Sequence, residues 1–408
     1  MPVNEPPRDG AELGWTLDGA VRHLNHGSFG AVPVAVQAEQ ERLRRQMEAN
    51  PVRWFSGLPE KIAAARSEIA HILQVPTQQL ALVPNASAGA SAVHDSLIGT
   101  GPVDVMVTDH GYGAISAGAR RLAQRSGGRA HEVAIPLAAP ADRVVELVAE
   151  HLERHRPGLL VIDQVTSATA RALPVAEICI LARELGVLSL VDGAHAPGVL
   201  AEPVCREADF WVGNLHKFAC APRGAAVLVA RDGERLHPVI DSWGAGLGFP
   251  ERFDHLGTLD LTAWLVAPFA WRHLEEQVGW ETIRRRAAEL ADAGQARLAE
   301  ALDGVVADPI PDVGQPVGPM RLVRLPGRLG SSREQADALR IPFCDLSGVA
   351  LAFTSFAGRG YLRFSTHLYT VKEDFDHLAT VGFPLLHRWA RQDQGDQPPN
   401  GVHFKEEA

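Results

Sequence analysis

The sequence predicts an α/β protein in which a large domain, built on a mostly parallel sheet sandwiched by helices, is followed by a smaller C-terminal α+β domain. Between residues 80 and 231, short apolar runs alternate with amphipathic stretches, which is the pattern of βαβ units. The apolar runs are continuous, as expected for strands that helices cover on both faces. After a long helical segment over 280–302, mixed strand and helix signals follow.

The elements of the large domain are predicted in a regular order. Two helices come first, over 34–50 and 60–74, because apolar residues recur there at helical spacing. Seven apolar runs are then predicted as strands: 80–83, 103–108, 130–135, 158–163, 187–192, 209–214 and 224–231. Amphipathic stretches between them predict helices over 117–127, 142–155 and 175–186.

The chain divides into four predicted segments. They are an N-terminal lead-in (1–20), the large domain (21–275), the small domain (276–390) and a polar tail (391–408). Within the small domain, strand signals lie over 320–326 and 360–365.

Charge and composition exclude several classes of partner. The 408 residues carry 39 Lys and Arg against 49 Asp and Glu, a net charge of −10. This balance argues against a surface that neutralises nucleic-acid phosphates or binds an anionic membrane. The sequence shows neither a long apolar stretch nor a basic, apolar start, so we expect a cytoplasmic protein.

The cysteines and histidines do not predict a metal centre. The four cysteines lie far apart without CxxC spacing, and the 17 histidines form no HExxH pattern. We therefore expect free thiols and no metal site.

Lysine is rare in this chain, which makes one lysine informative. Of the four lysines, Lys61, Lys372 and Lys405 lie in charged or polar stretches, whereas Lys217 lies among Leu, Phe, Ala and Cys. Taken alone, Lys217 would more often be a partly buried structural lysine, so its neighbourhood decides the interpretation.

Polar residues follow several predicted strands, at the edge where parallel α/β sheets bind ligands. Asp192 and His195 follow one strand, and His216 and Lys217 follow the next. Another strand precedes a group of polar residues, namely Asp163, Gln164, Ser167 and Thr169. A small-residue turn over 85–91 precedes a helix and could present backbone N–H groups to a phosphate.

A carboxylate at one strand end, with an isolated lysine 25 residues later, is the arrangement that a pyridoxal phosphate (PLP) enzyme requires. A desolvated lysine forms a Schiff base with the cofactor aldehyde. The carboxylate keeps the pyridine nitrogen protonated, which preserves the ring as an electron sink. Asp192 on its own could be a helix cap, but its spacing to Lys217 favours the PLP interpretation.

Several motifs together resemble one family over residues 20–390. They are LNHGSFG, DHGYGA, VDGAHAPG, GNLHK, GTLD and LRFSTHLYTVKED. The sequence resembles fold-type I PLP enzymes of the class V aminotransferase-like family, in the isopenicillin N epimerase-like branch, which is related to cysteine desulfurases and C–S lyases.

The resemblance implies a role for each matching residue. Lys217 would be the Schiff-base lysine and the base for the Cα proton, and Arg363 would bind the substrate carboxylate. Stacking on the ring, or a second acid, would come from His110 or Tyr112. The other implied cofactor contacts are Asn85, Ala86, Ser87, Ser167, Asp192, His195, Asn214 and His216. Thr258 would reach the phosphate of the neighbouring subunit in a homodimer. Further substrate contacts would be Asn25, His26 and Gln164.

The reaction stays open at this point. The resemblance suggests epimerisation at Cα of an amino acid or amino-acid conjugate in secondary metabolism. C–S lysis and decarboxylation-dependent oxidative deamination are alternatives, and a cysteine desulfurase or a non-catalytic homologue is less favoured. Two departures bear on this choice, because Gln164 stands where relatives often carry His and Ala170 replaces a frequent Gly.

Overall fold

The computed structural model describes residues 13–392. Part of the predicted lead-in, 1–12, and most of the predicted tail, 393–408, lie outside the described residues. Within the described range, no helix combines the length and the apolar character needed to cross a lipid bilayer.

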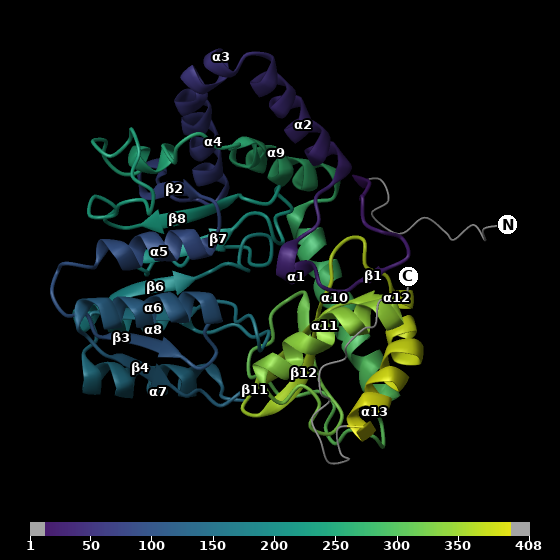
Figure 1. Cartoon of the computed structure of the whole chain (residues 1–408). Helices are drawn as coiled ribbons and strands as arrows, with labels where there is room; N and C mark the ends of the chain where they lie inside the picture. The colour runs from purple at the N-terminus through teal and green to yellow at the C-terminus, as the bar shows by residue number, and fades with distance from the viewer. Residues whose placement is uncertain (1–12, 393–408) are drawn as a thin grey trace, which may run out of the picture.

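A seven-stranded sheet forms the centre of the larger part of the molecule (Figure 1). From edge to edge its strands are β2 (Leu80–Val83), β8 (Ala226–Ala230), β7 (Phe210–Asn214), β6 (Leu188–Asp192), β5 (Leu159–Asp163), β3 (Val105–Thr108) and β4 (Ala130–Val133). Strands β7, β6, β5, β3 and β4 run parallel to one another, whereas β8 is antiparallel to both β7 and β2. The predicted α/β class with a mostly parallel sheet is confirmed, and every strand falls within a predicted apolar run.

Helices cover both faces of this sheet, which explains why its strands are apolar without alternation. One face shares a hydrophobic core with four helices: α4 (Leu58–Ile72), α7 (Ala141–His155), α8 (Val175–Glu184) and α9 (Thr262–Gln277). The opposite face packs against α5 (Ala86–Ser96) and α6 (Gly113–Ser126).

The N-terminal helices follow from local capping signals. The predicted helix over 34–50 is observed as α2 (Val34–Ala49), and the one over 60–74 as α4. Between them, α3 (Pro51–Ser56) starts with proline, and the Asn50 side chain accepts the backbone N–H of Arg53 at 3.0 Å. A single helical turn, α1 (His26–Phe29), precedes α2.

The C-terminal region has its own sheet and core. Its antiparallel strands are ordered β11 (Ala352–Phe356), β12 (Arg359–Ser365) and β9 (Met320–Arg324). Its helices are α10 (Trp280–Ala301), α11 (Arg333–Ser347), α12 (Lys372–His377) and α13 (Phe383–Gln392). Short turns of other helix types lie at Thr77–Gln79, Glu251–Asp254 and Leu378–Gly382.

The N-terminal segment before α1 joins this C-terminal region. Strand β1 (Arg22–His23) pairs in parallel with β10 (Val349–Ala350), and Leu24 belongs to the C-terminal core. The predicted boundary near residue 275 stays a prediction. The segment that carries α1 therefore lies between the two parts of the molecule, where the purple helix is seen in Figure 1.

Candidate active site

A cleft of about 500 Å³ lies between the central sheet and the C-terminal region. Parallel strands β5, β6 and β7 end at the same edge, so their following residues meet there. Among the side chains that line the cleft are Ser28, Tyr112, Ser167, His195, Lys217 and Arg363. The sequence-predicted lysine and arginine thus face one cavity, although 146 positions separate them along the chain.

Lys217 lies in the turn that follows β7, and its half-buried side chain reaches the cleft. Burial lowers the pKa of Lys217 to about 8, although the carboxylates of Asp192 and Asp163 oppose this shift. Its Nζ atom lies 3.0 Å from Nε2 of His195. Burial, followed by the charge of Lys217, lowers the pKa of His195 well below its ordinary value, so this imidazole is neutral.

Two buried carboxyl groups end neighbouring strands beside this lysine. Asp192 and Asp163 are cross-strand partners at the ends of β6 and β5. The backbone N–H of Ala194 donates to Asp192 at 2.9 Å, and that of Tyr112 donates to Asp163 at 3.0 Å. Burial raises the pKa of both acids, and Asp192 raises that of Asp163 further.

Asp163 is a site residue that the sequence-based assignments left out. Its position at the end of an apolar strand indicated a place near the ligand-binding edge of the sheet, but no sequence motif assigned it a role. The structure connects it to the backbone of Tyr112, which comes from a different segment.

Arg363 on β12 is a buried cation whose guanidinium group is held by neighbouring oxygen atoms. Its Nη1 donates to the carbonyl of Ser167 at 2.7 Å, and its Nη2 donates to Ser28 Oγ at 2.8 Å and to Asn25 Oδ1 at 3.3 Å. Its Nε has no hydrogen-bond partner, and none of the ion pairs found within residues 13–392 involves Arg363. Burial lowers its pKa to about 10, which leaves it charged at neutral pH. A substrate carboxylate would complete this site.

The start of α5 forms an anion-binding end close to the same edge of the sheet. Asn85 caps the helix by accepting the N–H of Ala88 at 2.9 Å, and Asn214 at the end of β7 accepts that of Ala86 at 2.9 Å. Ser87 stands in the first turn between them. A phosphate would find N–H groups and the positive end of the helix dipole here.

His216 precedes Lys217 in the turn after β7. Its Nδ1 lies 3.0 Å from the carbonyl oxygen of Ala225, which can only accept. Burial lowers its pKa to about 4, so it is neutral. Its Nε2 is thus left as an acceptor.

Of the sixteen predicted site residues, eleven do not line the cleft, and the five that do are Tyr112, Ser167, His195, Lys217 and Arg363. Four of the eleven have other surroundings. His110 is buried against Phe356, with Nδ1 2.7 Å from Thr169 Oγ1 and Nε2 2.9 Å from a backbone carbonyl. Gln164 instead accepts the indole N–H of Trp211 at 2.9 Å. The remaining two are His26, which lies behind the lysine turn, and Thr258, which lies in an exposed loop.

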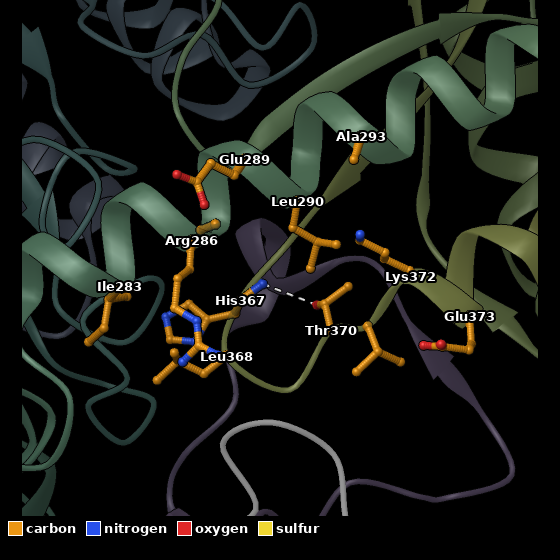
Figure 2. Close-up of a pocket in the computed structure, with 12 residues that line it drawn as sticks. Ile283, Arg286, Glu289, Leu290, Ala293, His367, Leu368, Thr370, Lys372 and Glu373 are labelled. Atoms are coloured by element: carbon orange, nitrogen blue, oxygen red, sulfur yellow. Dashed lines mark hydrogen bonds between the residues drawn. The ribbon is translucent and has the colours of Figure 1, made fainter. Parts of the chain in front are cut away.

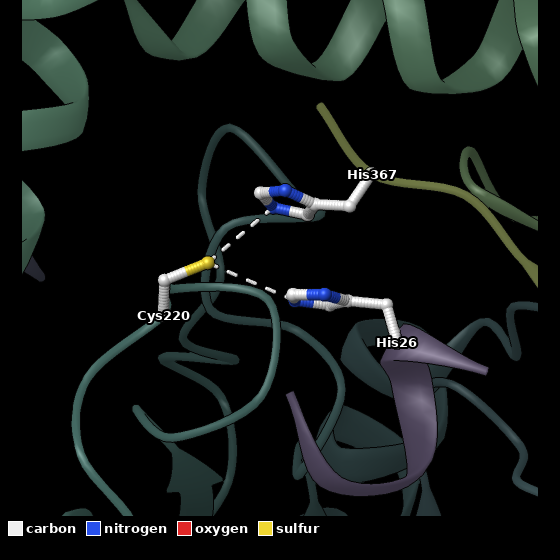
Figure 3. A group of neighbouring side chains, drawn as sticks. All are labelled: His26, Cys220 and His367. Atoms are coloured by element: carbon white, nitrogen blue, oxygen red, sulfur yellow. Dashed lines mark hydrogen bonds between the residues drawn. The ribbon is translucent and has the colours of Figure 1, made fainter. Parts of the chain in front are cut away.

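Behind the lysine turn, three possible metal ligands come together: His26, Cys220 and His367 (Figure 3). The Cys220 Sγ lies 3.7 Å and 3.6 Å from the two Nε2 atoms. However, the imidazoles stack 4.0 Å apart at 15°, so their in-plane lone pairs do not converge on one point. Each Nε2 also lies near a backbone carbonyl, of Lys217 or of Phe218, and would donate a proton to it. We therefore assign hydrogen bonding, not metal binding, to this cluster.

A second cavity, of about 480 Å³, lies between α10 and the segment 367–373 (Figure 2). His367 lines it, and the backbone N–H of His367 donates to Thr370 Oγ1 at 3.1 Å. None of the predicted catalytic residues lies in this second cavity.

The described side chains fit pyridoxal phosphate. An amine of lowered pKa stands beside a buried carboxyl group, and a helix N-terminus lies near the same sheet edge. The amine would hold the cofactor aldehyde, and the carboxyl group would contact the ring nitrogen. The helix N-terminus would bind the phosphate.

Comparisons with known proteins agree with this fit. The family described as Aminotransferase class-V matches residues 30–313. The isopenicillin N epimerase of Streptomyces clavuligerus is 30% identical over 385 residues, which cover 89% of this chain and 94% of the relative. The L-cysteine desulfhydrase of Arabidopsis thaliana is 30% identical over 269 residues, which cover 61% of this chain and 59% of the relative.

Two solved structures share the fold. The cysteine desulfurase of Thermococcus onnurineus NA1 superposes with a TM-score of 0.75 at 18% identity, covering 95% of this chain and all of the other. A C-DES variant with glycine covalently linked to its PLP cofactor gives a TM-score of 0.71 at 20% identity, covering 91% of this chain and 97% of the other. The chain therefore belongs to the class V aminotransferase family, and its cofactor is pyridoxal phosphate.

Proposed function

We propose that this protein is a PLP-dependent enzyme that acts at Cα of an amino acid or amino-acid conjugate, with epimerisation as its reaction. One observation carries the proposal: the amine of Lys217 and the buried, carboxylate-free guanidinium of Arg363 face the same cleft. The first group suits covalent attachment of the cofactor and proton removal, and the second suits the substrate carboxylate.

Bound PLP supplies an aldehyde that condenses with amines and a ring that takes up the electron pair released at Cα. Lys217 would hold that aldehyde, and its amine would serve as the base for the Cα proton. With a pKa of about 8, the amine is about half neutral at pH 8, so it can both accept and return a proton. His195, neutral and 3.0 Å from Nζ, orients it.

Asp192 and Arg363 would position the cofactor ring and the substrate carboxylate, respectively. Asp192 would hold a proton on the ring nitrogen, because a cation there favours its carboxylate form in a buried site. Arg363 would bind the substrate carboxylate through its Nη groups, whose hydrogen atoms now go to neighbouring oxygen atoms, and would thereby set the orientation of Cα.

Epimerisation also needs a proton donor on the face of the ring opposite Lys217. Tyr112 lines the cleft, is 43% exposed and has its backbone fixed by Asp163. His110 is engaged through both ring nitrogens. We therefore assign the second acid to Tyr112.

C–S lysis is the second candidate function. It is favoured by the relatives named L-cysteine desulfhydrase, and it needs no donor on the opposite face. A cysteine desulfurase would also need a nucleophilic thiol at its active site, and the free thiol of Cys344 on α11 does not line the cleft.

One experiment separates the two reactions. The purified protein is incubated in D₂O with L-amino acids and S-substituted cysteines, while Cα deuterium, thiol and pyruvate are followed. Epimerisation predicts deuterium at Cα in both stereoisomers without breakdown, and Tyr112→Phe should then retain exchange but lose inversion. Release of thiol and pyruvate, unchanged in Tyr112→Phe, would assign lysis instead.

We also propose that the enzyme is a homodimer whose interface includes the segment 236–260. This segment exposes five apolar side chains: Val239, Ile240, Trp243, Leu247 and Leu259. Trp243 is 96% exposed, which is unusual for an indole in a monomer. Thr258 lies in the same segment, where pairing could bring it to the partner's phosphate. Sedimentation should give a dimer, and Trp243→Ser should shift it to monomer and weaken PLP binding.

A further inference from the structure

The one-turn helix α1 and its cap residue Asn25 contact both Arg363 and the main chain of Lys217. On one side, Asn25 and Ser28 accept hydrogen bonds from Arg363. On the other side, His26 Nε2 lies 3.1 Å from the carbonyl oxygen of Lys217. Residues 25–28 thus connect the lysine turn to β12, which lies in the C-terminal region.

The tautomer of His26 is fixed by its two partners. A carbonyl oxygen can only accept, so Nε2 carries the proton and donates it to Lys217. Nδ1 is then an acceptor, and the Tyr369 hydroxyl donates to it at 3.0 Å. Burial, followed by the neighbouring His367, lowers the pKa of His26 well below its ordinary value, so the ring stays neutral.

A second imidazole supports the same turn one residue later. His367 Nε2 lies 3.3 Å from the carbonyl oxygen of Phe218, and its ring stacks on His26. Cys220, in the left-handed conformation at φ 56°, packs its thiol against both rings. Burial raises the pKa of this thiol, so it too is neutral.

We propose that His26, oriented by Tyr369, is a positioning residue that fixes the Lys217 turn relative to Arg363 and holds the lysine amine at its position in the cleft. This inference rests on the proposed role of Lys217. His26 touches neither the cleft nor the reacting atoms, and it acts through the main chain of the lysine and through α1.

The test compares three single variants, and one double variant that combines His26→Leu with Tyr369→Phe, in the full-length chain after removal of its cofactor. His26→Leu keeps bulk and removes the donor to Lys217. His26→Gln can restore an N–H donor near Nε2. Tyr369→Phe removes only the hydroxyl that orients His26. It therefore still tests the proposal if His26→Leu folds poorly.

The readout is the apparent pKa of the Lys217 amine, obtained from the pH dependence of its competitive acetylation and peptide mass spectrometry. The side chains that face this amine are His195, Asp192, Asp163 and Arg363, and all stay unchanged. Water that enters a loosened turn should raise the apparent pKa by about one unit toward that of a free lysine. Cofactor attachment should slow about tenfold in parallel.

A role in stability alone would lower the melting temperature and leave this labelling pKa in place. We expect His26→Gln to return the labelling pKa of Lys217 and the rate of cofactor attachment to near the parental values. In the His26→Leu background, Tyr369→Phe should change neither quantity further. A folded His26→Leu protein with the parental labelling pKa and attachment rate would overturn the inference. So would a His26→Gln protein no better than His26→Leu. If Lys217 is not the cofactor lysine, Lys217→Ala will retain bound cofactor, which is a separate outcome.

Discussion

The two sides of the lysine turn differ in charge. The cleft side holds Lys217, Asp192, Asp163 and Arg363, whose pKa values are all shifted by burial. The rear side holds imidazoles, a thiol and a phenol that are all neutral and joined by short contacts. The ionisable groups to which we assign binding and reaction are thus supported from behind by neutral groups, and the proposed chemistry is confined to the cleft side.

The largest expected effect comes from removing the amine on the cleft side. Lys217→Ala should abolish covalent cofactor attachment and lower turnover by at least about 1000-fold, because the base and the attachment point are lost together. Lys61→Ala is the matched control, since Lys61 is exposed and lies over the Trp54 ring. Visible absorbance and turnover are measured for both; equal loss in both variants would contradict the assignment.

Arg363→Lys should mainly affect substrate binding. Lysine keeps the charge but lacks the planar fork, so KM should rise roughly 100-fold with cofactor content unchanged. Arg359→Lys, four residues earlier on β12 and exposed, should leave KM at the parental value. An unchanged KM in Arg363→Lys would remove this residue from the substrate site.

Asp163→Asn should change how the free energy of unfolding depends on pH. The pKa of Asp163 is raised in the folded state, so folding favours its protonated form. As pH rises above about 3.9, the unfolded chain loses this proton first, and the folded state is progressively destabilised up to the folded pKa. The asparagine variant should lose less stability between pH 5 and pH 8 than the parent does.

Denaturant titrations of the cofactor-free chain at the two pH values measure this effect. An identical pH dependence in Asp163→Asn would show that Asp163 titrates alike in both states.

The smallest effect concerns Ala170, which lies at φ 50° in the left-handed region. Holding a side chain there costs about 1 kcal/mol, and the extra freedom of glycine in the unfolded chain offsets part of the gain. Ala170→Gly should therefore stabilise by a few tenths of a kcal/mol and leave turnover unchanged. Thermal unfolding checks this; destabilisation by more than about 1 kcal/mol would contradict it.

The sequence predicted what depends on local pattern. Strand runs such as 188–192 and 210–214 are continuously apolar, and parallel strands place their following residues at one edge. Lys217 and Asp192 could therefore be assigned to one site. Helix α9 was not predicted; it contains Pro268, which weakens the helical signal.

The rest depends on contacts between distant segments. The carbonyl of Lys217 accepts from His26, 191 positions away, and Arg363 donates to Asn25 across 338 positions. No spacing rule reports such pairs, so His26 was assigned to substrate binding. The hydrogen bonds of His110 could not be predicted for the same reason, because the partners of both its ring nitrogens come from other segments.

Reduction of the purified holoenzyme with borohydride, followed by peptide mass spectrometry, tests the central claim most directly. The covalent cofactor should be found on the peptide that contains Lys217. Its recovery on Lys61, Lys372 or Lys405 would contradict the assignment of the active site to this cleft.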